Sequence, residues 1–343
     1  MKTCSIIDAP SDLGLRHTGV DGLPQALRSA GLLEGLPAVR RAGSVPVPRY
    51  SPLRNQLHGV LNVDGIADFG RRLADRVAFT LDLGLFPVVL GGDCSILIGT
   101  SLALRRRGRF GLLFFDGHAD FYSPETEPNG EVASMDLAVV TGRGPAELSD
   151  TEQLSPLVRD EDAVVFGIRD AALAAADGSP DVRQTTMRVF DLGDVRKLGA
   201  AQAARLGVEA LEASGAEGFW IHLDADVLND EVMPAVDYRM PDGLWPEELS
   251  AALRVAVTSP LAMGMDVTIY NPAFDNAEWS AARTFAQAVR TAFVAAPQQT
   301  RQHRRRFAAL VTRQELDNTR DRGSKQPWRV RCGSNCARKI WGA

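Results

Sequence analysis

The chain has 343 residues, of which 45% are hydrophobic, 24% charged and 7% aromatic, and its formal net charge is -5. These values are typical of soluble globular proteins and exclude general disorder, because such a chain can bury a sizeable core. The sequence has no run of about 18 apolar residues and no apolar leader segment, so we expect neither a membrane span nor export.

Short β-rich apolar runs alternate with helical patterns along the first 295 residues, which is typical of a parallel sheet with covering helices. A helix is predicted at Pro24–Ala30, and apolar residues from Ile66 to Leu81 recur at helical spacing. The later predicted elements are the strands Phe86–Leu90, Gly111–Phe115, Ala163–Ile168, Met187–Phe190, Phe219–Leu223 and Ala262–Tyr270, and the helices Ile96–Arg106, Ala200–Ala213, Pro246–Val257 and Asn276–Ala295. No repeat or linker interrupts this pattern, which indicates a single domain.

Charge divides the chain near Ala296. From there on, twelve Lys and Arg face three Asp and Glu, a net charge of +9, which leaves -14 on the first 295 residues. The tail 296–343 is rich in Arg and Gln and lacks sustained periodicity, so we expect a disordered extension. Binding of a nucleic acid or an acidic partner through Arg304–Arg306 is the alternative, although we expect no nucleic-acid partner.

The four cysteines are too few and too unevenly placed for a disulfide framework, and a reducing cytoplasm fits them best. Cys332 and Cys336 form a C-x3-C pair, but no second ligand pair lies nearby, so a zinc site in the tail is not expected. Cys94 follows a predicted strand, and Cys4 lies near the N-terminus.

Three polar segments each come directly after a predicted strand. They are GGDCS at 91–95, DGHAD at 116–120 and DAD at 224–226. Ligands of open α/β sheets gather outside the carboxyl ends of the strands, so the three segments should meet in one crevice. Each motif alone is a weak signal, and Gly91-Gly92 lacks the spacing of a dinucleotide site. Their shared position at strand ends makes the combination informative.

Carboxylates brought together in one crevice repel each other unless a cation compensates them. Alternate residues of an extended segment share a face, so Asp116, His118 and Asp120 form one set, and Asp224 and Asp226 form another. Divalent cations would supply the missing positive charge. The sequence therefore predicts a metal site.

With these motifs, the chain resembles the ureohydrolases, the binuclear manganese hydrolase family that includes arginase, agmatinase and formimidoylglutamase. The resemblance runs from about Ser5 to Ala295 and rests, in order, on IIDAPSDLGLRHTGVDGLPQALRSAGL, FPVVLGGDCS, FFDGHADFYSPET, GIRD and HLDADVL. It implies an arginase-like, three-layer α/β/α fold with a mainly parallel sheet over residues 1–295. It also implies a homo-oligomer, usually a trimer or a hexamer.

The resemblance further implies a ligand set for two divalent metals. The first metal would be held by Cys94, Asp116, Asp120 and Asp224, and the second by Asp116, His118, Asp224 and Asp226. A bridging water with a lowered pKa would supply hydroxide, which attacks a planar carbon bearing nitrogens. Asp120 would accept the proton and pass it to the leaving amine.

Four positions depart from the family pattern. Most members have His where this chain has Cys94, and thiolate favours zinc or iron, so manganese is expected first with these two as alternatives. Ala133 stands in the place of the shuttle His, Ile269 in that of the Glu which pairs with guanidinium in arginases, and Ala172 in that of an acid near the substrate's α-amino group. We therefore do not expect a standard arginase.

One branch shares several of these departures. The stretches PETEPNGEVASM at Pro124–Met135 and AVDYRMPDG at Ala235–Gly243, together with Cys94 and D-G-H, resemble the Nω-hydroxy-L-arginine amidinohydrolases. We therefore expect a small guanidino, hydroxyguanidino or related amidine substrate.

Loop residues complete the predicted site. Glu131 is a candidate catalytic residue that could replace the proton shuttle, and the candidate substrate-binding residues are Glu125, Asn129 and Asp170. His222, two residues before Asp224, is interpreted as a core imidazole or one that supports the metal ligands.

Two other functional classes compete with this enzyme. One is a non-catalytic arginase-like scaffold that keeps metal for structure, which the missing His and Glu favour and the retained aspartates oppose. The other is a thiol enzyme with Cys94 as nucleophile, which would need a base that the metals leave unused.

Overall fold

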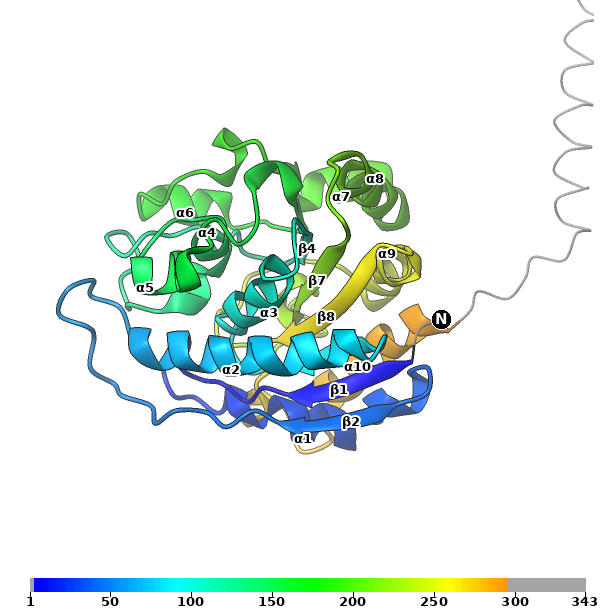
Figure 1. Ribbon diagram of the computed structural model, residues 1–343. Coiled ribbons are helices and arrows are strands. Elements are labelled where there is room, and N and C mark those ends of the chain that lie inside the picture. The colour runs from blue at the N-terminus through cyan, green and yellow to red at the C-terminus, as the bar shows by residue number, and fades with distance from the viewer. Residues whose placement is uncertain (1–2, 295–343) are drawn as a thin grey trace, which may run out of the picture. The chain divides into compact units, whose positions relative to one another are not determined.

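A computed structural model describes residues 3–294 of the chain. Within that range, eight parallel strands form one sheet in the order β2-β1-β3-β8-β7-β4-β5-β6 (Figure 1). The strands are β1 Cys4–Asp8, β2 Arg40–Ser44, β3 Phe86–Leu90, β4 Gly111–Phe115, β5 Ala163–Phe166, β6 Arg188–Phe190, β7 Phe219–Asp224 and β8 Ala262–Thr268. The predicted α/β fold with a parallel sheet is confirmed.

Helices cover both faces of the sheet and make the three layers (Figure 1). The α-helices are α1 Leu23–Ser29, α2 Val63–Asp82, α3 Ile96–Arg105, α4 Asp136–Val140, α5 Ala146–Ser149, α6 Ala171–Ala176, α7 Leu192–Leu198, α8 Ala200–Ala213, α9 Pro246–Thr258 and α10 Ser280–Phe293. Side chains of α2, α3 and α4 share one core with Leu112 and Phe114 of β4, whereas α1, α8, α9 and α10 share the other core with Leu113 and Phe115. Alternate residues of one strand thus serve opposite layers.

The sequence prediction missed both strands at one edge of the sheet. β1 has the sequence CSIID with only two aliphatic residues. β2 is an edge strand with the sequence RRAGS whose residues are largely exposed, so it has no apolar pattern to detect. The prediction also extended β5 too far, because Gly167 turns the chain with a φ of +102°. Likewise, the last helix begins at Ser280 and not at Asn276, after Trp279 adopts a left-handed conformation.

The strand order determines where the polar motifs meet. β3, β8, β7 and β4 are adjacent in the middle of the sheet and all parallel, so the segments that follow β3, β4 and β7 leave the same edge. This edge carries the candidate site.

Among the described residues, no helix is long and apolar enough to cross a membrane. The predictions for the tail 296–343, including Arg304–Arg306 and the Cys332/Cys336 pair, lie outside the described residues.

Candidate metal centre

The strand-end segments bring acidic, thiol and imidazole groups together in three overlapping clusters, within each of which the ligand atoms lie no more than 4.8 Å apart. We name them the deep cluster (Cys94, Asp116, His222 and Asp224), the outer cluster (Asp116, His118 and Asp226) and the side cluster (Cys94, Asp120 and Asp136). Of these side chains, only His118 is more than marginally exposed. All six predicted metal ligands belong to at least one cluster, and His222 and Asp136 join them.

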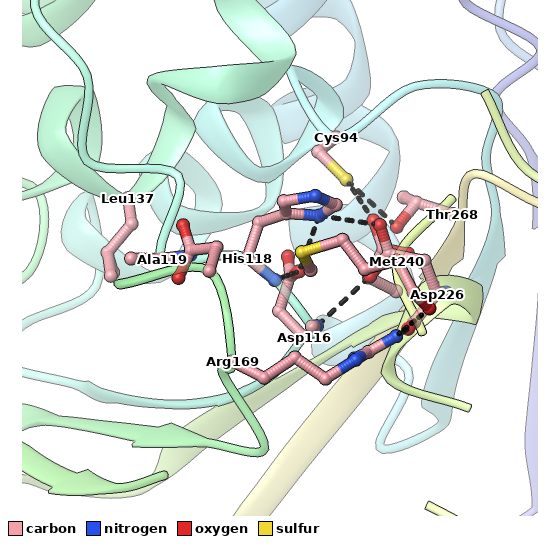
Figure 2. Close-up of polar contacts among 12 residues, drawn as sticks. Cys94, Asp116, His118, Ala119, Leu137, Arg169, Asp226, Met240 and Thr268 are labelled. Carbon is pink, nitrogen blue, oxygen red and sulfur yellow. Dashed lines mark hydrogen bonds and ion pairs between the residues drawn. The ribbon is translucent and has the colours of Figure 1, made fainter. Parts of the chain in front are cut away.

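In the deep cluster, the thiol of Cys94 contacts two neighbours (Figure 2). Its Sγ donates to Oδ2 of Asp224 at 2.9 Å and also lies 3.2 Å from Oγ1 of Thr268. Gly92, two residues earlier, has no room for a side chain, because a Cβ would lie 1.8 Å from the carbonyl oxygen of Ser11. The Gly91-Gly92 turn therefore lets the chain approach the first loop closely enough to place Cys94.

In the outer cluster, His118 pairs with Asp226. The ring Nδ1 lies 2.8 Å from Oδ2 of Asp226, and Oδ1 of the same carboxylate accepts the amide of Gly117 at 3.0 Å. Arg169 donates to the carbonyl oxygen of Asp226 at 2.9 Å and so ties the loop after β5 to the loop after β7 (Figure 2).

Backbone amides hold both carboxylates that the predicted ligand sets share. Oδ1 of Asp116 accepts the amide of His118 at 2.6 Å, and Oδ1 of Asp224 accepts the amide of Asp226 at 2.6 Å. Asp120 has a φ of +44°, which is unusual for a residue with a side chain and points to a constrained loop.

The protein groups of the three clusters do not supply enough positive charge to compensate their buried acids. Burial, reinforced by neighbouring carboxylates, raises the pKa values of Asp116, Asp120 and Asp224 well above the ordinary range. Burial also raises the pKa of Cys94. A group of buried acids with raised pKa values is stabilised by nearby positive charge.

The His118–Asp226 pair behaves differently from the other acids. Burial disfavours the imidazolium, yet the facing carboxylate raises the pKa of His118 to about 9. Burial also opposes ionisation of Asp226, yet His118 lowers its pKa to about 2. A cation bound to both groups would take over the role of the imidazolium proton.

Three buried atoms test whether a metal fits. Oδ2 of Asp116, Oδ2 of Asp136 and Nε2 of His222 have no hydrogen-bond partner. Buried polar atoms of native proteins are normally paired, and an unpaired acceptor costs about 1–3 kcal/mol. Carboxylate oxygens and imidazole nitrogens are ligands that divalent transition metals prefer, and these three residues belong to the clusters named above, so the residues fit the metals that the sequence predicted.

Comparison with known proteins places the chain in a family. The Arginase family model matches residues 2–295. The arginase of Staphylococcus aureus is 31% identical over 282 residues, covering 80% of this chain and 92% of that protein. The arginase structure of Bacillus caldovelox superposes with a TM-score of 0.76 at 27% identity, covering 86% of this chain and 99% of that one.

The chain belongs to the arginase family.

The arginase family depends on two metals, in agreement with the buried clusters of this chain. The fold also resembles formimidoylglutamase of Bacillus subtilis, with a TM-score of 0.66 at 18% identity over 85% of this chain and 86% of that one. The predicted ureohydrolase resemblance and the arginase-like fold are therefore confirmed.

The arginase-family centre opens into a cavity of about 240 Å³. Four predicted ligands line it, and they are His118, Asp120, Asp224 and Asp226. Ala133 and Ile269 line it too, so two of the positions that depart from the family pattern face the cavity. The space left by these small and apolar residues is thus open to the metal centre.

The loop residues predicted to act on substrate take different places. Asn129 lines the cavity, whereas the carboxylate of Glu125 is exposed. Glu131 is buried but is not among the lining residues, because its carboxylate accepts the amide of Arg16 at 2.9 Å and the hydroxyl of Tyr238. Asp170 is buried and accepts the amide of Ala119 at 3.0 Å, so it supports the DGHAD loop.

Sequence reasoning overlooked several lining residues, which include Glu127, Tyr122, Asp177 and Tyr238. Glu127 is 6% exposed, and its Oε2 accepts the amide of Glu131 at 2.8 Å. Burial, with Glu131 nearby, raises the pKa of Glu127. Its position between the two predicted glutamates was visible, but no periodicity in this loop shows which carboxylate turns inward.

Proposed function

We propose that this arginase-family chain hydrolyses a linear C–N bond of a guanidino, hydroxyguanidino or related amidine compound, and that it is not a standard arginase. The observation that carries the proposal is the pairing of a complete acidic cluster with an adjoining cavity that contains Ala133 and Ile269. The acidic cluster supports the view that the chain has kept a hydrolase activity. The lining residues Ala133 and Ile269 support a substrate other than arginine.

The residues divide into two ligand sets. By the family resemblance, Cys94, Asp116, Asp120 and Asp224 would hold one metal, and Asp116, His118, Asp224 and Asp226 would hold the other; each of these residues belongs to at least one of the three clusters. When bound, two divalent cations supply Lewis acidity and lower the pKa of water. Manganese is the first expectation and zinc or iron the alternatives, since Cys94 is a soft ligand.

Asp120 is the proposed proton carrier, because it lines the cavity and belongs to the side cluster. It takes the proton that water loses as oxygen bonds to the planar carbon, and it delivers that proton to the nitrogen as the C–N bond breaks. Glu127, Asn129 and Tyr238 would bind the polar part of the substrate. Glu131 would position Tyr238 through their hydrogen bond and is not required to touch substrate.

Turnover assays on metal-loaded protein test the proposal. A panel of arginine, hydroxyarginine, agmatine, other guanidino acids and formimino compounds should reveal release of urea, a urea analogue or an amide product. We expect a hydroxyguanidino or other guanidino compound to outperform arginine. Asp120→Asn should lower kcat at least about a hundredfold while the protein still folds.

Two results would refute the proposal. Protein that holds two metals per chain but turns over no member of the panel would support the competing hypothesis of a non-catalytic scaffold. Arginine as the best substrate would identify a standard arginase. Elemental analysis of the purified protein decides which metal it binds. The homo-oligomer and the cytoplasmic location that the sequence led us to expect remain predictions.

A further inference from the structure

His222 lies in the metal centre in a way that its sequence position did not reveal. It is on β7 and is completely buried, and its ring stacks on Phe114 of β4 with centroids 4.7 Å apart. On the other side, β8 places Asp266 directly opposite His222 in the strand register. Nδ1 of His222 lies 2.6 Å from Oδ1 of Asp266.

Asp266 is itself held firmly. Its Oδ2 accepts the indole Nε1 of Trp220 at 2.6 Å and the hydroxyl of Thr100 at 3.1 Å. Both oxygens of this fully buried carboxylate are therefore engaged. An acidic acceptor of this kind holds the ring proton of His222 on Nδ1, which leaves the lone pair on Nε2.

The ring of His222 lies beside the predicted ligands, and one of its nitrogens is free. Nε2 of His222 is buried and has no hydrogen-bond partner. The ring contributes a ligand atom that lies within 4.8 Å of ligand atoms of Cys94, Asp116 and Asp224. An imidazole whose role is only to fill the core would normally have both nitrogens paired.

We propose that His222 binds the metal of the deep cluster through Nε2, with Asp266 as its positioning residue. Metal-bound histidines commonly donate their other ring N–H to a carboxylate, which is the arrangement that His222 and Asp266 already have. Family members with His at position 94 draw an imidazole from the end of β3, whereas in this chain β7 would supply it. The assignment rests on the metal centre of the proposed function and adds a ligand to it.

Metal affinity is the decisive measurement, made by chelator competition on the full chain. His222→Phe keeps a ring against Phe114 but removes Nε2, and we expect the affinity for one of the two bound metals, that of the deep cluster, to fall at least about a hundredfold. Asp266→Asn should weaken the same metal by about tenfold, because the ring loses its acidic acceptor. His222→Gln, a smaller change, serves if the Phe variant fails to fold.

Phe114→Leu is the matched control, because it removes the stacking partner and leaves both ring nitrogens in place. We expect it to lower the thermal midpoint of metal-free protein without changing metal affinity. His222→Phe should instead reduce the rise in midpoint that metal produces.

Pulsed EPR of manganese-loaded protein with 15N-histidine gives a readout independent of affinity and activity. Wild type should show imidazole nitrogen coupled to both metals, and His222→Phe should lose the coupling at one of them. Unchanged couplings and unchanged affinity in His222→Phe would overturn the assignment. Wild type that binds two metals without turnover would instead refute the proposed hydrolase and leave His222 as a ligand.

Discussion

The candidate metal centre and the rim of its cavity are built from different secondary structure. Asp116, Asp224 and His222 stand on or directly after buried central strands, and neighbouring strands hold their side chains in register. The rim residues Glu127 and Tyr238 come instead from irregular loops, where hydrogen bonds to other loop residues place them. Under the proposed function, strand ends would carry the metal chemistry and loops would select the substrate.

The strongest test of the central region is Asp224→Asn. Asp224 belongs to the deep cluster and is one of the two carboxylates expected to join both metals, so we expect metal binding to fail. Since metals supply several kcal/mol of transition-state stabilisation, kcat/KM should fall at least about a thousandfold. Elemental analysis and steady-state assays measure both effects.

Asp162→Asn is the control for a buried aspartate away from the centre, where Asp162 pairs with Arg109 at 2.7 Å. It should lower the free energy of unfolding and leave metal content unchanged. If Asp224→Asn retains two metals per chain, the bridging role is wrong.

At the rim, Glu127→Gln tests whether a loop carboxylate binds substrate. The amide can still accept the backbone amide of Glu131, so the loop should keep its shape. Loss of a charged contact to a cationic substrate should raise KM about tenfold to a hundredfold with metal content unchanged.

Glu125→Gln tests the neighbouring carboxylate. The sequence predicts that Glu125 binds substrate, whereas it is Glu127 that lines the cavity. The exposed side chain of Glu125 leads us to expect the smaller effect of the two. A larger rise in KM for Glu125→Gln would restore the sequence prediction.

These two regions also differ in how far the sequence could predict them. The DGHAD and DAD segments were recognisable because carboxylates directly after apolar runs must lie at one edge of a parallel sheet. The ligand role proposed for His222 was not recognisable from the sequence. That role depends on the strand register, which sets Asp266 opposite His222, and on Nε2, which has no partner. In the loop, Glu127 turns inward beside a turn closed by Ser123 and Thr126, a contact that spacing alone cannot specify.

Cys94→Ser tests the one soft ligand in the central region. Thiolate binds zinc more strongly than hydroxyl does, so zinc affinity should fall by at least about tenfold while manganese affinity changes less. Competition between the two metals, followed by elemental analysis, measures the shift. Cys4→Ser is the matched control, since Cys4 is also buried and free but lies on β1. Equal shifts in both variants would show that Cys94 does not bind metal.

The smallest expected effect concerns the stability of metal-free protein across pH. Acids whose pKa is raised by folding, such as Asp116 and Asp224, stabilise the fold below their unfolded pKa of about 4 and lose that contribution as pH rises. His118, with a pKa of about 9 in the fold, loses its contribution between its ordinary value of 6.5 and about 9, in the same direction. Asp226, with a pKa of about 2, acts in the opposite sense only below about pH 4.

Thermal midpoints of chelator-treated protein should therefore fall by a few degrees from about pH 5 to about pH 9. Saturating metal should remove most of this slope, because the cations replace the protons that the cluster otherwise needs. Glu127 at the rim also has a raised pKa, but it belongs to none of the three clusters, so Glu127→Gln should leave the metal-dependent part of the slope intact. A slope that persists with metal bound would place its origin outside the metal centre and weaken the distinction between the two regions.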